Sequence, residues 1–511
     1  MRRTCTSPRE SAASRRTSVV SDSAARRVEL DRRKIGRSAA SGPERAADNG
    51  VAGPCYAPDW PTPREEPRVP PTALQSSGIV LQPELPICQT DLPLDWYQAE
   101  FKPYAEEYLA LPDRKASTVL PWLDRYVRPA QAHFGDALML VAHFYMGGEI
   151  VKLVERYGGS VADSYQLALQ AQRHPEKKVI VESAVHFMAE AIAILAHPDQ
   201  QVWITNPKAG CTMEMLAKDW MVLPVADQLI ERYGDDVVVV AYMNTGGRLK
   251  ALAGRTGGAV CTSSNAHKVV KWALARGKKV FFVPDQHLGR NTARKLGLDL
   301  ARVVAFPDPQ IGRGALRVDE KCVPGGLAAL DRAQMILWGS FCGVHTVFKP
   351  EHVHYWRERG YQVLVHPESK LEVVELADGE GSTNFLWDAV MNAPRGAKLA
   401  IGTEGHFVRN AREQGKLRGV EIVHLADIPD PAYQSIGCGC ATMSRNDPPH
   451  LAGMLDLLRK GLAPDANRVL AGDMVDETTG VRDRLDERER SGMLADARVS
   501  LERMIAITEA R

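Results

Sequence analysis

Residues 237–245, "VVVVAYMNT", form a continuous apolar run that ends in polar side chains. An apolar run of this length without polar alternation predicts a strand buried on both faces, as in a parallel sheet. Two other stretches have the same form: "ALMLVAHFY" at 137–145 and "YQVLVHPES" at 361–369. The chain therefore carries three similar strand signals at long spacing, and these decide the fold class.

Each of these strands opens a series of four elements that recurs in the same order. The second element is rich in Ser and Thr ahead of a helical pattern, and the third carries a His followed by Phe or Leu. The fourth ends in a cysteine, which is Cys211, then Cys342, then Cys438 or Cys440. Alternating strand and helix signals indicate α/β layers, and their repetition indicates related domains.

We predict an α/β protein of three related α/β domains with parallel sheets around a pseudo-threefold axis. The predicted ranges are 93–232 with its opening helices, 233–358 with an insertion at about 303–335, 359–475, and a C-terminal helical segment at 476–511. Residues 1–92 are rich in Arg, Ser and Pro and lack hydrophobic periodicity, so we predict a disordered extension there.

Length and composition narrow the class of protein. A chain of 511 residues suggests about three domains. The net charge of +1 supplies no overall field that favours nucleic acid or an anionic membrane, and no apolar run approaches the ~18 residues of a membrane helix. An odd number of cysteines, nine, in a large chain argues against a disulfide framework and for a reducing compartment. We expect a cytoplasmic protein without nucleic-acid or membrane partners.

The recurring cysteines predict a metal centre. Ligands of open α/β sheets bind beyond the carboxyl ends of the strands, so three domains around one axis would bring three cysteines together. Three thiolates suit an iron–sulfur cluster or zinc, and the C-x-x-C pairs common in structural zinc sites are absent from the sequence. A [4Fe–4S] cluster held by three thiolates leaves one iron open as a Lewis acid. The alternative for any one cysteine is a small buried hydrophobic residue.

A dozen short motifs carry a resemblance to a known family. They occur in the order "AHFY", "ADSYQLA", "VHFMAE", "KAGC", "YMNT", "TSSNA", "FVPDQHL", "GSFCGVH", "HPE", "GST", "GTE" and "GCGCATMSRND". Together, between about 97 and 475, they resemble the quinolinate synthase family. The resemblance implies a [4Fe–4S] cluster at the junction of three domains. It also implies condensation of iminoaspartate with dihydroxyacetone phosphate to quinolinate, with loss of phosphate and water, for NAD biosynthesis. An L-aspartate oxidase that supplies iminoaspartate is the candidate transient partner.

The resemblance also implies roles for individual residues. The cluster ligands would be Cys211, Cys342 and Cys440, where the spacing to Met443 favours Cys440 over Cys438. The general acid and base groups would be Tyr145, His366 and Glu368. The substrate-binding residues would be His143, Ser164, Tyr242, Met243, Asn244, Ser263, His345, Ser382 and Thr383. Hydroxyls at helix N-termini suit substrates that carry carboxylates and a phosphate.

Simpler interpretations exist for the same residues. The Ser and Thr residues can be plain helix caps, Tyr145 a core tyrosine, and His366 with Glu368 a strand-end hydrogen-bond pair. For the whole chain, one alternative is another three-cysteine [4Fe–4S] enzyme with pseudo-threefold architecture. A second is a non-catalytic iron–sulfur or zinc scaffold protein. The "TSSNA" and "HFMAE" segments argue against the first, and the recurring polar triplets would have no purpose in the second.

Overall fold

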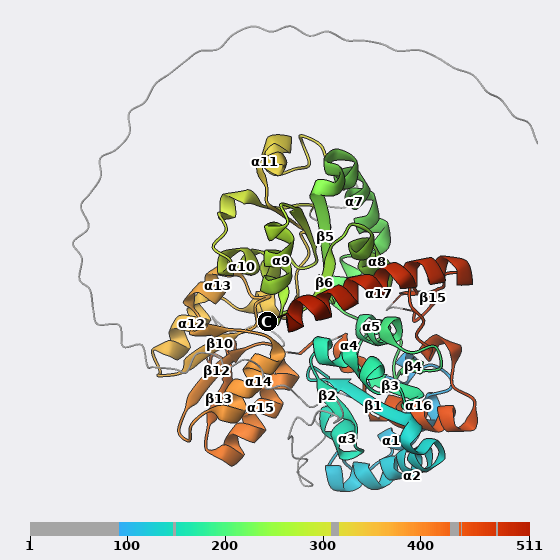
Figure 1. Cartoon of the computed structure of the whole chain (residues 1–511). Helices are drawn as coiled ribbons and strands as arrows, with labels where there is room; N and C mark the ends of the chain where they lie inside the picture. The colour runs from blue at the N-terminus through green and yellow to red at the C-terminus, as the bar shows by residue number, and fades with distance from the viewer. Residues whose placement is uncertain are drawn as a thin grey trace, which may run out of the picture. The chain divides into compact units, whose positions relative to one another are not determined.

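The computed structural model describes residues 91–146, 150–307, 316–429, 439–440, 442–476 and 479–510. The predicted disordered extension, residues 1–92, lies outside the described residues except for its last two, and so does Cys438. All described residues belong to one compact unit. Within it the chain forms three parallel sheets, each interleaved with helices (Figure 1). This confirms the predicted α/β class.

The first sheet has the strand order β2-β1-β3-β4, with every pair parallel. Its strands are β1 Leu138–His143, β2 Ser160–Ala162, β3 Val179–Ser183 and β4 Gln201–Ile204. Its helices are α3 Ile150–Arg156, α4 Ser164–Arg173, α5 His186–Leu195 and α6 Thr212–Met215, after the opening helices α1 Lys102–Leu109 and α2 Ala116–Phe134. All six residues of β1 are buried, as its uninterrupted apolar sequence predicts.

The second sheet repeats this order and adds a strand at its edge, giving β6-β5-β7-β9-β8. Its strands are β5 Val237–Tyr242, β6 Ala259–Cys261, β7 Lys279–Val283, β8 Val303–Ala305 and β9 Met335–Leu337. Its helices are α7 Asp219–Tyr233, α8 Gly247–Arg255, α9 Ala266–Ala275, α10 Gln286–Lys295 and α11 Gly326–Arg332. The extra strand β8 and helix α11 lie in the range predicted as an insertion.

The third sheet has the order β11-β10-β12-β13, again all parallel. Its strands are β10 Gln362–Val365, β11 Gly379–Glu380, β12 Lys398–Gly402 and β13 Glu421–His424. Its helices are α12 Pro350–Arg357, α13 Leu371–Leu376, α14 Thr383–Asn392 and α15 Gly405–Arg418. Each sheet falls within one predicted domain range, while the boundaries themselves stay a prediction.

The chain after the third sheet returns to the first. Helix α16, Pro448–Lys460, packs against α1 and α2. Further on, the backbone N–H of Val469 donates to the carbonyl of Val202 in β4 at 2.9 Å. The side-chain amide of Asn467 donates to the carbonyls of Ile204 and Thr205. The segment that follows the third cysteine is thus fixed to the unit that carries the first.

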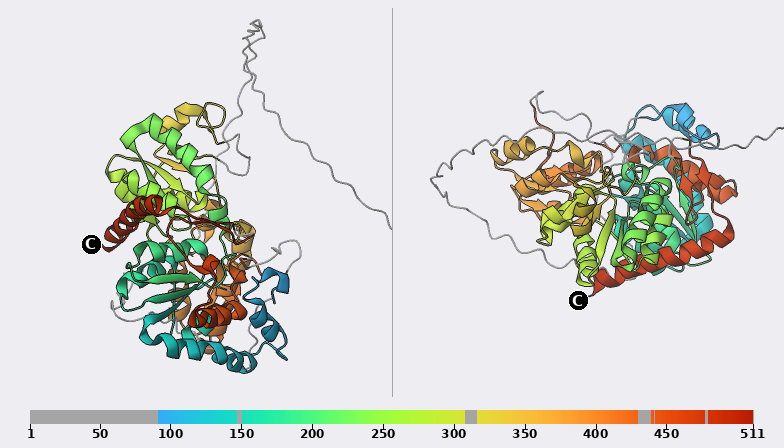
Figure 2. Two further views of the ribbon diagram at one scale, coloured as in Figure 1. Left: turned by 90° about the vertical axis from the view of Figure 1, so that its right-hand side faces the viewer. Right: turned by 90° about the horizontal axis from the view of Figure 1, so that it is seen from above.

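Helix α17, Glu487–Glu509, ends the described chain and packs against α8, α9, β6 and α5 (Figures 1 and 2). It therefore covers elements of the second and first sheets. The guanidinium of Arg498 donates to the carbonyls of Ile194 and Ala196 at the end of α5. A cation is favourable there, because the last carbonyls of a helix lack intrahelical partners and carry partial negative charge.

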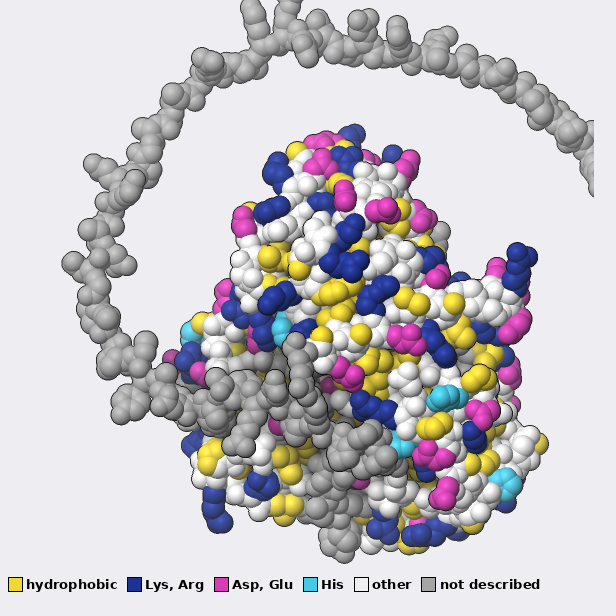
Figure 3. Space-filling model, in the orientation of Figure 1, with side chains coloured by type: hydrophobic (Ala, Val, Ile, Leu, Met, Phe, Trp, Pro, Cys, Tyr) yellow, Lys and Arg dark blue, Asp and Glu magenta, His cyan; other side chains and the backbone are white. Residues whose placement is uncertain are grey.

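The remaining regular elements are short. Strands β14 Met474–Val475 and β15 Arg482–Asp483 form an antiparallel pair before α17. The 3₁₀ turns are η1 Leu94–Trp96, η2 Gly135–Ala137, η3 Gly234–Asp236, η4 Leu300–Arg302, η7 His345–Val347, η8 Met443–Arg445 and η9 Asp465–Asn467. Basic and acidic side chains are interspersed on the face drawn in Figure 3, in keeping with the net charge of +1. No helix in the described part of the chain is long and apolar enough to cross a membrane.

The first prediction concerns the contact of α17 with α5. Arg498→Met keeps the aliphatic stem and removes the donors to the two carbonyls, so the free energy of unfolding should fall by about 1–3 kcal/mol. Chemical denaturation would measure this loss. The exposed Arg488 on the same helix serves as control, and Arg488→Met should leave stability within ~0.5 kcal/mol of the wild type. Equal stability of the two variants would contradict the assignment.

Candidate active site

A cavity lies where the three sheets meet, and residues of all three line it. Thirteen of the fifteen predicted site residues line it: His143, Tyr145, Ser164, Cys211, Tyr242, Asn244, Ser263, Cys342, His345, His366, Glu368, Thr383 and Cys440. Met243 and Ser382 do not.

The two exceptions have local reasons. Met243 follows the last residue of β5, and side chains of an extended segment alternate in direction. Tyr242 and Asn244 reach the cavity, while Met243 is fully buried away from it. Ser382 is the N-cap of α14, where its Oγ accepts the backbone N–H of Phe385 at 3.4 Å. Its hydroxyl therefore serves the helix and not the cavity.

Two hydroxyls predicted at helix starts lie one residue inside their helices. Asp163 caps α4 by accepting the N–H of Gln166 at 3.0 Å, and Ser164 is the first helical residue. In the same way Ser382 caps α14 and Thr383 follows it. Because the preceding residue supplies the cap, neither hydroxyl is needed to cap its helix. Both residues line the cavity, where the hydroxyl of Thr383 donates to that of Tyr145 at 3.0 Å.

The three cysteines share a local structure. Each lies just before a short helical turn, so that the backbone N–H three residues later points at its sulfur. The N–H of Glu214 serves Cys211, that of His345 serves Cys342, and that of Met443 serves Cys440. The amide nitrogen of Asn244 also lies 3.6 Å from the Cys211 sulfur. The hydroxyl oxygen of Thr442 lies 3.3 Å from the Cys440 sulfur. Donors of this kind tune sulfur ligands of metal clusters.

Burial makes these thiols hard to ionise. Cys211 and Cys342 are buried and Cys440 is partly buried, and none of them forms a disulfide. Burial raises the pKa of all three thiols, and the neighbouring sulfurs raise those of Cys211 and Cys342 further. Thiolates are therefore favoured only beside a strong positive charge. The donor set of three thiols with N–H donors at each sulfur fits an iron–sulfur cluster or a metal ion held from three sides.

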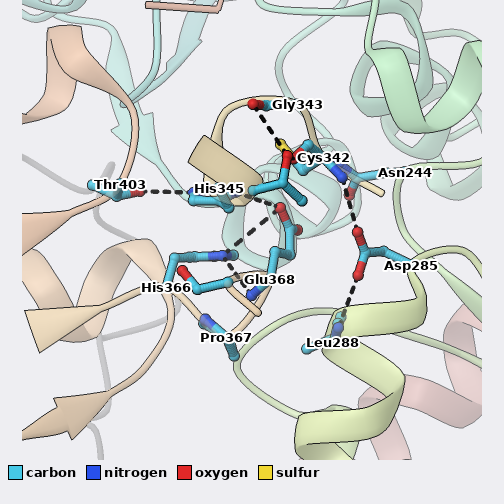
Figure 4. A network of polar contacts seen from close by, with 12 residues as sticks. Asn244, Asp285, Leu288, Cys342, Gly343, His345, His366, Pro367, Glu368 and Thr403 are labelled. Carbon is cyan, nitrogen blue, oxygen red and sulfur yellow. Dashed lines mark hydrogen bonds and ion pairs between the residues drawn. The ribbon is translucent and has the colours of Figure 1, made fainter. Parts of the chain in front are cut away.

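Two carboxylates fix the loops that carry the second and third cysteines. Asp285, the N-cap of α10, accepts the backbone N–H of Cys342 at 2.9 Å (Figure 4). Glu404, the N-cap of α15, accepts the backbone N–H of Cys440 at 3.0 Å. Sequence analysis did not identify either residue as part of the site. Both stand two positions before the recurring His, and that common position is the signal that would have found them.

Glu368 is the buried charge of the site. The hydroxyl of Tyr242 donates to its Oε1 at 2.5 Å. On the other side, Nδ1 of His345 lies 2.8 Å from its Oε2 (Figure 4). Burial alone would raise the pKa of Glu368, but the contacts that His345 and Tyr242 make with its carboxylate outweigh burial and lower the pKa. The carboxylate is therefore ionised at neutral pH. The ligand atoms of Cys342, His345 and Glu368 lie within 4.8 Å of one another, so this carboxylate reaches the space beside the thiol.

A chain of hydroxyl contacts joins Tyr145 to the same carboxylate. The hydroxyl of Tyr145 lies 2.8 Å from Oγ1 of Thr403, and that oxygen lies 3.1 Å from Nε2 of His345. Thr383 donates to the Tyr145 hydroxyl at 3.0 Å. Burial raises the pKa of Tyr145 above its ordinary value, so the phenol keeps its proton. Thr403 was missed because its role depends on contacts with two other sheets.

His143 and His366 occupy equivalent positions at the ends of β1 and β10. In each, Nδ1 accepts the backbone N–H two residues later, at 3.2 Å from Tyr145 and 3.4 Å from Glu368. This pattern assigns the proton of the neutral ring to Nε2. Burial lowers the pKa of both histidines to about 3, so both are neutral at pH 7. The ring of His366 stacks on that of His345 with centroids 4.4 Å apart.

Comparison with known proteins gives one consistent family. A sequence model of the family described as quinolinate synthetase A protein matches residues 128–471, a range that contains every residue of the cavity. The quinolinate synthase of Streptomyces coelicolor is 38% identical over 428 residues, which cover 83% of this chain and 98% of that protein. Those of Corynebacterium glutamicum and Bacillus subtilis are each 36% identical, over 76% and 66% of this chain and 88% and 86% of theirs.

The second prediction follows from the neutral histidines. An unfolded histidine titrates near pH 6.5, while His143 in the folded chain has a pKa of about 3. The unfolded state therefore binds more protons below pH 6.5, and the free energy of unfolding falls as the pH falls. His143→Gln should reduce the loss between pH 7 and pH 5 by about 2 kcal/mol.

Denaturation at the two pH values in the metal-free protein would measure this difference. The exposed His133 provides the matched control, and His133→Gln should keep the wild-type pH dependence. If His143→Gln also kept it, the ring of His143 would not be held neutral in the folded protein.

Proposed function

The chain belongs to the quinolinate synthase family, and we propose that it condenses iminoaspartate with dihydroxyacetone phosphate to quinolinate, with loss of phosphate and water. The observation that carries this proposal is the arrangement of the cavity. Three thiols from three sheets share it with an ionised carboxylate, neutral histidines and a protonated tyrosine. We place this reaction in the cytoplasm and in NAD biosynthesis.

Cys211, Cys342 and Cys440 would hold a [4Fe–4S] cluster. Such a cluster supplies a Lewis acid at the iron that has no protein ligand. The N–H donors at the three sulfurs compensate part of the thiolate charge. Three thiolates leave that fourth position open, unlike the four protein ligands of a structural zinc site.

The hydroxyls of Ser164 and Ser263 would bind the anionic ends of the substrates. Thr383 would contribute through the backbone N–H groups of the helix that it opens, because its hydroxyl donates to Tyr145. Ser164 and Thr383 stand in the first turn of ten-residue helices, where backbone N–H groups lack intrahelical partners. These groups and the helix dipole favour carboxylate and phosphate without a large net charge in the cavity. The amide of Asn244 adds a further donor beside Cys211.

Two groups with opposite protonation states in the cavity, Glu368 and Tyr145, would share the proton transfers. Ionised Glu368 can accept a proton during tautomerisation, and the protonated phenol of Tyr145 can donate one to a departing hydroxyl. The contacts through Thr403 and His345 connect these two groups. Neutral His366 and His143 present Nε2–H groups as hydrogen-bond donors.

The two alternative functions, another cluster enzyme and a scaffold protein, differ from the proposed one in what the cavity would bind. Another three-cysteine [4Fe–4S] enzyme would bind the cluster and turn over different substrates. A scaffold protein would bind iron or zinc and have no use for the ionised carboxylate in the cavity, whose burial costs free energy. An L-aspartate oxidase, as the source of unstable iminoaspartate, belongs to the proposal as a transient partner.

The third prediction tests reaction and cluster together. Reconstituted protein, kept anaerobic and supplied with dihydroxyacetone phosphate and iminoaspartate formed in situ, should make quinolinate detectable by chromatography. Cys342→Ala should lose activity and hold far less iron than the wild type. Cys261→Ala is the matched control, because that buried thiol lies outside the cavity and should leave iron binding unchanged.

Each contrary outcome has a distinct meaning. A wild type that holds about four irons but makes no quinolinate would remove the substrate assignment and favour another cluster enzyme. Full iron in Cys342→Ala would remove the three-thiolate assignment.

The fourth prediction concerns the base. Glu368→Gln keeps the shape of the side chain and an acceptor for Tyr242, but it removes the charge. We expect kcat to fall by roughly 10²–10⁴ while the iron content stays that of the wild type. A variant with unchanged kcat would exclude Glu368 from the proton transfers.

A further inference from the structure

The loop that carries Glu368 is held from another sheet by one side chain. Asn291 lies on α10 of the second unit, and only 1% of it is exposed. Its Nδ2 donates to the carbonyl of Pro367 at 2.8 Å and to that of Ser369 at 2.7 Å. These two residues flank Glu368, so both hydrogens of the amide hold the backbone on either side of the ionised carboxylate.

The contact requires an amide. A side-chain NH₂ group has two hydrogens, and here two carbonyl oxygens use both of them. This pairing also settles which end of the amide is nitrogen, because two carbonyls need donors. The amide oxygen of Asn291 has no hydrogen-bond partner among the described residues. A carboxylate at this position would place an acceptor oxygen, in place of the NH₂ donor, against the two carbonyls.

The same helix position makes a similar contact in the first unit. Asn291 stands four residues after His287, and Glu190 stands four residues after His186. The carboxylate of Glu190 accepts the backbone N–H of Gly247 at 2.7 Å and that of Gly472 at 2.7 Å. Gly247 opens α8, three residues after Asn244. Glu190 of the first unit thus contacts the segment that follows β5 of the second unit, and Asn291 of the second unit contacts the segment that follows β10 of the third.

We propose that Asn291 is a positioning residue for Glu368. The side chain of Glu368 is held by Tyr242 and His345, and the carbonyls on either side of it by Asn291, and these three residues all belong to the second unit. Without Asn291 the turn can shift while its two side-chain partners remain. The inference rests on the proposed function, because it concerns the placement of the proposed base.

The test compares Asn291→Ala and Asn291→Asp with a matched asparagine. Asn392 ends α14, is exposed, and donates its Nδ2 to the carbonyl of Asp388 on its own helix. In the reconstituted holoenzyme, both Asn291 variants should lose roughly tenfold to hundredfold in kcat. KM should stay within about twofold, and Asn392→Ala should match the wild type.

A double-mutant cycle separates positioning from general damage. If Asn291 acts through Glu368, Asn291→Ala should have little further effect on kcat/KM in the Glu368→Gln background, within about twofold. Additive losses would overturn the proposal. So would global unfolding of both Asn291 variants, because it would assign the residue to the stability of the fold.

Hydrogen exchange keeps this test independent of the reaction. Peptides that contain residues 366–369 should exchange faster in Asn291→Ala than in the wild type or in Asn392→Ala. A wild type that makes no quinolinate would remove the proposed function, and the exchange of this loop would still decide whether Asn291 holds it. Unchanged exchange in both Asn291 variants would overturn the proposal.

Discussion

Three thiols that share one largely buried cavity are the constraint on which the rest of the structure depends. Burial raises their pKa values, so they can act as thiolate ligands only beside strong positive charge. That requirement explains the donors at each sulfur and the short turns that deliver them. It also demands that three sheets end at one place, since each sheet supplies one cysteine. The return of residues 446–475 to the first sheet fixes the third unit against the first.

The proposed proton-transfer groups also depend on contacts between units. Glu368 comes from the third unit and takes its hydrogen bond from Tyr242 and its closest histidine contact from His345, both of the second. Tyr145 comes from the first unit, and its hydroxyl contacts those of Thr403 and Thr383 in the third. A carboxylate this deeply buried stays ionised only where such partners surround it. The chemistry of the cavity is thus a property of the interfaces between units.

The features that local sequence patterns encode could be predicted. Buried parallel strands appear as uninterrupted apolar runs, so "VVVVAYMNT" and its two counterparts were found, and the polar residues behind them led to the cavity. Patterns within one segment could not reveal Thr403 or Asn291, whose roles arise from contacts with residues distant in sequence. They also gave no sign that Met243 turns away from the cavity, because a strand-end motif does not say which of its members faces inward. The return of residues 446–475 to the first sheet lies beyond such patterns for the same reason.

The three units share one plan, and their differences occur at equivalent positions. Asp285 and Glu404 hold the cysteine loops of the second and third units, but Ala184 stands at this position in the first. Glu190 accepts two N–H groups where Asn291 donates to two carbonyls. A strictly threefold cavity would present identical groups from three sides. The two unlike substrates of the proposed reaction would need different neighbours, and small changes of polarity at repeated positions would supply them without altering the fold.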